Sequence, residues 1–479
     1  MSSSRARVLC LLLLPGLLAL PTIAGAFCGF FVSGADADLY NDASQVVLMR
    51  RGNRTVMTMS NNYKGPPQDF AMVIPVPTVL REDDVKTLPA DVFEHVDKLS
   101  APRLVEYWEQ DPCYIEPEVE SMAVLGSAPE DDGGVELSLG VKVEARFEVG
   151  EYQIVILSAK EATGLDTWLR QNKYSIPKGA AEALAPYVRD GMKFFVAKVN
   201  VKKVKRDASG AIVLSPLRFT YESDALRLPV RLGLLNAQGA QDLLIYVLHP
   251  TARFEVANYT NVFIPTNVEV LDKVKDSFGA FYVSLFDAAL AKVGGKGVVT
   301  EYAWQTSGCD PCPVPPLTDG DLVTLGGDLL GVTGPMAGAE KAVPGQPFFG
   351  PASDWVLTRL HTRYSKDTLS EDLVFREAKA ITGGRSQWDG KSVEQAGEVR
   401  DAESNNFQGR YIIRHPWKGP VVCKDARYNR WGGPPTGGAP APQAATGLAS
   451  APRGKVALPE VVTSKLEALG LPGIPAPKK

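Results

Sequence analysis

The sequence predicts an α+β fold with mainly antiparallel sheet and interspersed helices. Strand-like and helix-like segments interleave, but they do not follow the regular βαβ period of a parallel α/β protein. No repeat of 20–50 residues is present, which argues against a solenoid or propeller. The composition is globular, with 45% hydrophobic and 22% charged residues in 479 positions. We therefore expect one large module followed by a flexible C-terminal tail.

The first 26 residues match a secretory signal peptide. Arg5 and Arg7 supply the positive charge, residues 8–20 form an apolar stretch too short to span a bilayer, and Ala24-Gly25-Ala26 is an A-x-A cleavage site. We expect the mature chain to begin at Phe27 and to reside in the periplasm, the cell envelope or the extracellular medium. No later stretch approaches about 18 uninterrupted apolar residues, so the mature chain should carry no transmembrane anchor.

The net charge of the chain indicates which class of partner is not expected to bind. Removing Arg5 and Arg7 with the signal takes away two positive charges and changes the formal net charge from −4 to −6. No stripe of Lys and Arg is present, so nucleic acid is not expected as a partner. The expected partner is an unknown component of the envelope or surface.

Alternation and turn residues predict the elements of the N-terminal part. Residues 46–63 are typical of a hairpin that turns at Arg51-Gly52-Asn53, and residues 70–74 form a short apolar strand that Pro75 and Pro77 close. The other elements expected here are helical segments on either side of Pro102 (90–109), strands at 135–149 and 152–157, helices at 165–172 and 180–191, and a strand at 192–204.

The C-terminal part continues the same plan. Strands are expected at 217–223, 242–250 and 260–265, a helix at 277–295, a strand at 298–306, a Gly/Pro-rich loop at 326–351, ordered structure at 355–375 and a strand at 410–417. The module should span 27–431, with a sub-boundary near 306–351 as an open alternative. Residues 432–479 have the composition of a flexible linker and end in a short helix at 459–470, between Pro459 and Gly470.

Five cysteines remain after the signal is removed, and in an exported chain they are candidates for disulfides. The odd number leaves at least one thiol or an intermolecular bridge, and the spacing does not fix the pairing. The five candidates are Cys28, Cys113, Cys309, Cys312 and Cys423.

The stretch TSGCDPCPVPPL (306–317) poses the sharpest chemical question, because its two cysteines have the spacing of a redox pair. A reactive pair normally begins a helix, whose N-terminus stabilises the thiolate. Prolines at 313, 315 and 316 exclude a helix here, which favours a structural role. A Cys309–Cys312 bridge requires a cis Asp310–Pro311 bond or a distorted loop, and the alternative is that each sulfur has a distant partner. Asp111-Pro112-Cys113 repeats Asp310-Pro311-Cys312, so the two segments are candidate neighbours.

The sequence gives weaker indications of a hydrolase site or a metal site. The chain has no G-x-S-x-G, H-E-x-x-H or EF-hand motif, and its four histidines lie far apart in the sequence. Asp319-Gly320-Asp321 is typical of a turn, and the alternating Glu116, Glu118 and Glu120 are typical of a solvated strand face, with a calcium site as the alternative. Zinc would need two further ligands beside Cys309 and Cys312, for which Cys423 and His415 are candidates in principle. We assign no catalytic residue, metal ligand or cofactor.

Several longer stretches resemble a known family. They are CGFFV, NDASQVVLMR, NNYKGPPQDFAMVIPVP, EYWEQDPC, ILSAKEATGLDTWLRQNKYSIP, GCDPCPVPPL and LTRLHTRYSKDTLSEDLVF. Together they are similar, over residues 27–431, to the domain-of-unknown-function family 2330 of uncharacterised and mostly exported bacterial proteins. The resemblance implies secretion and a single large module, and it supplies no catalytic residue. We expect an exported, disulfide-stapled binding or structural protein; the alternative is a secreted hydrolase or a thiol oxidoreductase using Cys309 and Cys312.

Overall fold

The structure is a computed structural model, and the statements below concern the residues that it describes. These are residues 30–33, 40–64, 70–113, 143–172, 174, 176–200, 202–206, 212–235, 239–332, 354–384, 386–388, 393–395, 399–436, 438, 440–448, 451 and 453–463.

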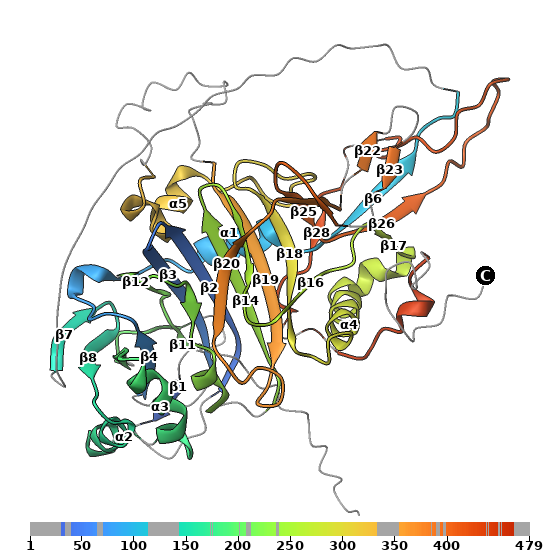
Figure 1. The fold of residues 1–479 in the computed structure, drawn as a ribbon. Coiled ribbons are helices and arrows are strands. Elements are labelled where there is room, and N and C mark those ends of the chain that lie inside the picture. The colour runs from blue at the N-terminus through green and yellow to red at the C-terminus, as the bar shows by residue number, and fades with distance from the viewer. Residues whose placement is uncertain are drawn as a thin grey trace, which may run out of the picture.

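A mixed sheet of 11 described strands forms the centre of the molecule (Figure 1). Its strands are, in order, β24 (Arg400–Asp401), β21 (Ile381–Gly383), β25 (Asn406–Gln408), β18 (Gly297–Gln305), β19 (Val356–Tyr364), β14 (Gln241–His249), β2 (Tyr40–Arg51), β3 (Arg54–Lys64), β12 (Leu217–Glu222) and β5 (Val85–Thr87), with β16 (Thr260–Phe263) beside β18. Most neighbours are antiparallel, but β2 runs parallel to β14, β16 to β18 and β21 to β25. The predicted α+β class is confirmed.

The predicted N-terminal hairpin is confirmed. β2 and β3 pair in antiparallel fashion up to Arg51 and Arg54, and Gly52 in the turn has a φ of 60°. Such a left-handed backbone suits glycine, because a side chain there would clash with the following carbonyl.

A second sheet covers one face of the central sheet. It contains β1 (Phe30–Ser33), β4 (Phe70–Val76), β9 (Lys193–Val199), β8 (Tyr152–Ser158) and β7 (Val143–Val149) in this order. The helices α2 (Ala162–Gln171) and α3 (Ala180–Arg189) pack on its outer face, while α1 (Asp91–Ser100) and α5 (Asp319–Leu325) pack on the other face of the central sheet. The core thus has four layers.

Alternation along the strands divides the side chains between these layers. On β2, Val46 and Leu48 face the second sheet, whereas Val47 and Met49 face α1 and α5. Successive strand residues point to opposite faces, so a strand covered on both sides is apolar at nearly every position.

The helix α4 (Phe278–Ala291) anchors a separate part of the core. It packs near a sheet of five described strands: β17 (Val268–Glu269), β26 (Arg410–His415), β6 (Arg103–Glu109), β27 (Trp431–Gly432) and β28 (Gln443–Ala444). The smaller described strands are β13 (Arg227–Leu228), β20 (Leu373–Ala378) and β15 (Arg253–Val256) in one sheet, and the ribbons β10 (Lys205–Arg206) with β11 (Ile212–Val213) and β22 (Ser386–Trp388) with β23 (Val393–Gln395). Short 3₁₀ turns lie at η1 (Glu82–Asp84), η2 (Arg231–Leu235), η3 (Asp272–Ser277), η4 (Gly327–Leu329) and η7 (Leu458–Glu460).

The predicted helical segment after Pro102 is wrong. Residues 91–100 are helical, but β6 begins at Arg103 and pairs in parallel with β26. The chain must leave the helix before Pro102, and Leu104, Val105 and the aromatic residues that follow suit an extended backbone. The strand partner lies so far along the chain that a local pattern could not reveal it.

The expectation of a flexible tail is also wrong for its described part. Ala444 pairs with Arg103 of β6, and Ala445, Leu448 and Leu458 are buried against the α4 core. The expected helix at 459–470 is wrong as far as it is described, because residues 458–460 form a 3₁₀ turn and Val462 then bridges to Val270. Residues 464–470 lie outside the described residues. These apolar side chains hold a Pro/Gly/Ala-rich segment on the body despite its composition.

Candidate functional site

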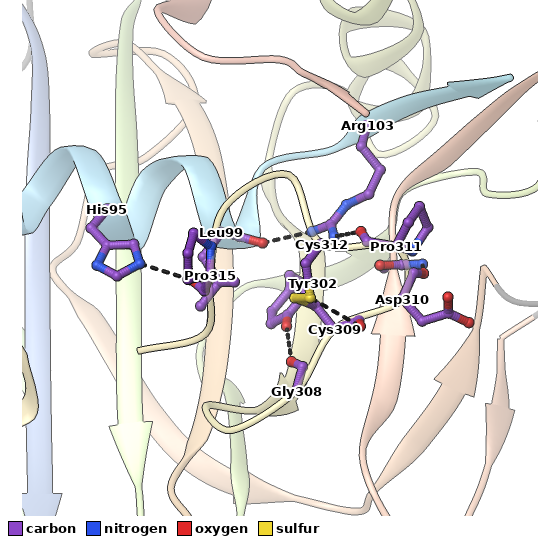
Figure 2. Close-up of a disulfide and its surroundings, with 11 residues drawn as sticks. His95, Leu99, Arg103, Tyr302, Gly308, Cys309, Asp310, Pro311, Cys312 and Pro315 are labelled. Atoms are coloured by element: carbon purple, nitrogen blue, oxygen red, sulfur yellow. Dashed lines mark hydrogen bonds between the residues drawn. A yellow bond between two sulfur atoms is a disulfide. The ribbon is translucent and has the colours of Figure 1, made fainter. Parts of the chain in front are cut away.

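The two cysteines of the stretch 306–317 form a disulfide with each other (Figure 2). Their Cα atoms are 5.1 Å apart, and the Asp310–Pro311 bond between them is cis, which is the first of the two geometries that the sequence left open. No helix begins at the pair, as the prolines predicted, and α5 starts only at Asp319. The nearby Asp319-Gly320-Asp321 opens this helix, with Asp321 and Thr318 capping each other.

The body of the protein holds this loop through its backbone carbonyls. Arg103 Nη1 donates to Pro311 O over 2.7 Å, and His95 Nε2 donates to Pro315 O over 2.8 Å (Figure 2). The hydroxyl of Tyr302 donates to Gly308 O, and the Gln408 amide donates to Asp310 O. Side chains from α1, β6, β18 and β25 thus converge on one short loop.

Arg103 connects the loop to the end of α1. Its guanidinium is fully buried, donates to Leu99 O over 2.6 Å and lies over the ring of Tyr302 at 5.6 Å. A cation at the C-terminus of a helix satisfies carbonyls that have no partner within the helix. Burial, with the neighbouring cations Arg359 and Arg410, lowers the pKa of Arg103 to about 10. Because this arginine donates to carbonyls and the pair lacks a helix N-terminus, the geometry supports a pinned loop more than an activated thiol.

A second group of polar residues is buried between the central sheet and the helices α1 and α4. Arg359 Nε lies 2.6 Å from Glu301 Oε2, and Arg359 Nη1 lies 2.6 Å from Asp97 Oδ1. The side chains of Arg359 and Glu301 are both fully buried. The other carboxylate oxygen of Glu301 accepts hydrogen bonds from His361 and from Tyr282. Buried charges are tolerated only when they are paired and hydrogen-bonded in this way.

His361 extends this cluster toward a second carboxylate. Its Nδ1 lies 2.7 Å from Glu301 and its Nε2 lies 3.0 Å from Asp242, while the ring stacks on Phe286 at 3.9 Å. Asp242 also accepts hydrogen bonds from Arg363 and Arg453. We call Asp97, Asp242, Glu301, Arg359 and His361 the buried ionic cluster.

The charged neighbours shift the pKa values within the cluster. Burial alone would lower the pKa of His361, but Glu301 and Asp242 outweigh it and raise this pKa above its usual 6.5. Burial alone would raise the pKa of Glu301, but His361 and Arg359 outweigh it and lower this pKa to about 2. Burial alone would also raise the pKa of Asp242, but the hydrogen bond and charge of His361 outweigh it and lower this pKa as well. At about pH 6 the cluster therefore holds a protonated histidine between two ionised carboxylates.

This arrangement does not match a hydrolase triad. A triad histidine gives one ring nitrogen to a carboxylate and the other to a nucleophile, but both nitrogens of His361 face carboxylates.

The sequence contains one pattern that could have indicated the buried ionic cluster. In β19, Arg359, His361 and Arg363 alternate, so all three point to one face of the strand.

All four histidines in fact lie beside a carboxylate, although they are scattered in the sequence. The pairs are His95 with Asp321 at 3.4 Å, His249 with Glu377 at 3.6 Å, His361 with Asp242 at 3.0 Å, and His415 with Glu106 at 2.9 Å.

The last of these pairs belongs to a group with metal-ligand chemistry. Glu106, Asp272 and His415 offer ligand atoms within 4.8 Å of one another. However, Lys275 Nζ lies 2.6 Å from one oxygen of Glu106 and His415 lies on the other. Burial alone would raise the pKa of Glu106, but hydrogen bonds from Lys275 and His415 lower it. Lys275 already compensates the charge of Glu106, so we assign no metal to the group.

The strands β6 and β26 continue into a second disulfide-bonded feature, between Cys113 and Cys423, whose Cα atoms are 5.5 Å apart. We call residues 110–113 and 416–430 the stapled arm. It extends away from the body at the far ends of the two strands (Figure 1). The backbone of the arm is fixed as well. Glu109 accepts hydrogen bonds from the amides of Trp417 and Asn429, Arg427 N donates to Pro112 O, and Arg430 donates to Asp111 O.

The stapled arm exposes large apolar side chains. The described residues include four exposed large hydrophobic side chains, and three of them lie here within eight positions. They are Val421, Val422 and Tyr428, with 40%, 87% and 55% of their surface exposed; the fourth is Leu271, with 43%.

The structure thus accounts for most of the residues that the sequence singled out. Cys113, Cys309, Cys312 and Cys423 form two disulfides, so they are not available together as a zinc site with His415. The repeated Asp-Pro-Cys segments are not bonded to each other. Cys28, Glu116, Glu118 and Glu120 lie outside the described residues.

Fold and site together define an α+β protein with two disulfides, a buried ionic cluster and an exposed apolar arm. The chain belongs to the family described as an uncharacterized protein conserved in bacteria (DUF2330), whose model matches residues 22–376. The predicted family is confirmed, but the match ends before residue 431 and leaves out β26 and the 416–430 part of the stapled arm. Neither the curated proteins nor the solved structures contain a match to this chain. Among the described residues, no helix is long and apolar enough to cross a bilayer.

Proposed function

We propose that this chain is an exported bacterial binding protein that contacts a component of the cell envelope through the stapled arm. The observation that carries the proposal is the concentration of exposed apolar side chains at Val421, Val422 and Tyr428. Exposed apolar residues gathered in one place mark an interaction site more often than scattered ones do.

The rigidity of the stapled arm supports the same reading. A disulfide and several hydrogen bonds fix the backbone that carries these side chains. A loop that is already ordered loses little conformational entropy when it binds, so more of the contact energy appears as affinity. The secretory signal that the sequence predicts at residues 1–26 supports export, and export would supply the oxidising compartment in which such disulfides persist.

Cell fractionation tests this proposal. The full chain is expressed in a bacterium with two membranes, and the mature N-terminus is sequenced. We expect cleavage after Ala26 and recovery with the envelope fraction. The double variant V421D/V422D should shift to the soluble exported fraction, whereas L271D, which changes the exposed hydrophobic residue outside the arm, should not. Retention of an uncleaved chain in the cytoplasm would refute export, and equal behaviour of the two variants would refute the role of the arm.

A further inference from the structure

We infer that the stapled arm docks on an anionic phospholipid surface. This inference rests on the proposed function and names the component that the arm contacts. We call the exposed apolar residues Val421, Val422 and Tyr428 the tip of the arm. Val421 and Val422 are adjacent and have purely aliphatic side chains, so both favour a hydrocarbon environment over water. Tyr428 adds an aromatic ring with a polar end, a side chain that is enriched at membrane–water interfaces.

Basic residues outnumber acidic ones in the stapled arm. Lys418, Lys424 and Arg427 are exposed and Arg430 is half-buried, while the acidic residues of the arm are the exposed Asp425 and the half-buried Asp111. The whole chain carries a formal net charge of −4, so the arm is locally opposite in sign to the protein that bears it. Basic residues near an anionic bilayer are attracted to its surface potential.

We call Lys418, Lys424 and Arg427, which flank the apolar residues along the chain, the basic collar. Exposed basic and apolar residues together match a partner that is negative at its surface and apolar beneath, and an anionic bilayer has this profile. The arm extends beyond the rest of the described body (Figure 1). At the base of the arm, the hydrogen bond between His415 and Glu106 at 2.9 Å and the stacking of His415 on Trp108 at 4.6 Å join β6 to β26. These contacts between β6 and β26 hold the base of the arm in place.

Vesicle co-sedimentation tests the inference on the purified, oxidised mature protein. One set of vesicles contains phosphatidylcholine alone, and the other contains about one third phosphatidylglycerol, because surface charge is the variable of interest. We expect binding to the anionic vesicles and at least about tenfold weaker partitioning to the neutral ones. High salt should reduce the binding, since it screens the collar.

Variants assign the binding to the arm. V421D/V422D and K424E/R427E should each lower partitioning by about tenfold or more, because one removes the apolar tip and the other inverts the collar. The matched controls are L271D for the tip and K160E/K178E for the collar, since Lys160 and Lys178 are exposed residues of another part of the surface. Equal losses in the arm and control variants, or equal binding to the two vesicle types, would overturn the inference.

The two proposals fail in different ways. If the wild-type protein ignores anionic vesicles but its envelope recovery still depends on Val421 and Val422, the partner is not lipid and the proposed function stands. If neither vesicle binding nor envelope recovery depends on these residues, both proposals are wrong.

Discussion

The substitution Glu301→Gln probes the buried ionic cluster most sharply. It preserves the size of the side chain but removes the charge that faces Arg359 at 2.6 Å and His361 at 2.7 Å. The amide also brings an NH₂ group toward neighbours that are themselves donors, so at least one hydrogen bond is lost. Removing one partner of a buried ion pair costs about 3–5 kcal/mol, because the remaining charges stay buried. That loss is a large fraction of the roughly 5–15 kcal/mol by which proteins are stable.

Urea unfolding followed by tryptophan fluorescence measures the effect at about pH 6, where both His361 and Glu301 keep their charges. We expect the free energy of unfolding of Glu301→Gln to fall by about 3–5 kcal/mol. The matched control is Glu377→Gln, because Glu377 also pairs with a histidine, His249, but is 63% exposed. An exposed pair contributes about 0–1 kcal/mol, so the control should change little. A loss below about 1 kcal/mol in Glu301→Gln, or equal losses in both variants, would refute the assignment of this cluster to stability.

Three further predictions follow from the same contacts. The free energy of unfolding should be highest between about pH 4.5 and 6.5. Above pH 6.5 the protein loses the stabilising contribution of His361 as the pH passes the raised pKa of this residue. Below pH 4.5 it loses the contribution of Glu301 as the pH falls toward the lowered pKa of about 2. Urea titrations across this range check the profile, and a steady rise toward pH 9 would contradict it. Peptide mapping without reduction should recover Cys113 linked to Cys423 and Cys309 linked to Cys312; a Cys113–Cys312 peptide would contradict the structure. Arg103→Met should lower the free energy of unfolding by about 2–3 kcal/mol and speed amide exchange in 308–315, since it removes charged donors to Pro311 and Leu99; unchanged exchange would show that Arg103 does not hold the loop.

Local patterns in the sequence predict the layered core well. The alternation in residues 46–63 and the turn at Gly52 specify the hairpin, because strand period and turn conformation are local properties. The prolines after Cys312 exclude a helix for an equally local reason. By contrast, residues 103–109 contain apolar positions that fit either a helix or a strand. Their partner strand lies about 300 positions away, as the 309-residue separation of Glu106 and His415 shows, so the choice depends on tertiary pairing.

The site could be predicted only in part. That the mature cysteines form disulfides follows from the expected compartment, but the choice of Cys423 for Cys113 depends on the parallel pairing of β6 with β26. The alternation of Arg359, His361 and Arg363 shows that they share a face, yet not that this face is buried against Glu301 and Asp97. The linker-like composition after Gly432 hides the apolar residues that dock on α4, because a few well-placed side chains outweigh the average of a segment.

We propose that the tip of the stapled arm touches another component of the cell envelope. Site-specific photo-crosslinking in cells tests it most directly: a photoreactive amino acid replaces Val422 in one strain and Leu271, the exposed hydrophobic residue outside the arm, in another. We expect the chain with the probe at position 422 to be captured with envelope lipid or protein, and we expect no capture of the chain with the probe at position 271. Equal capture at the two positions, or none at position 422 while the exported protein is abundant, would contradict it.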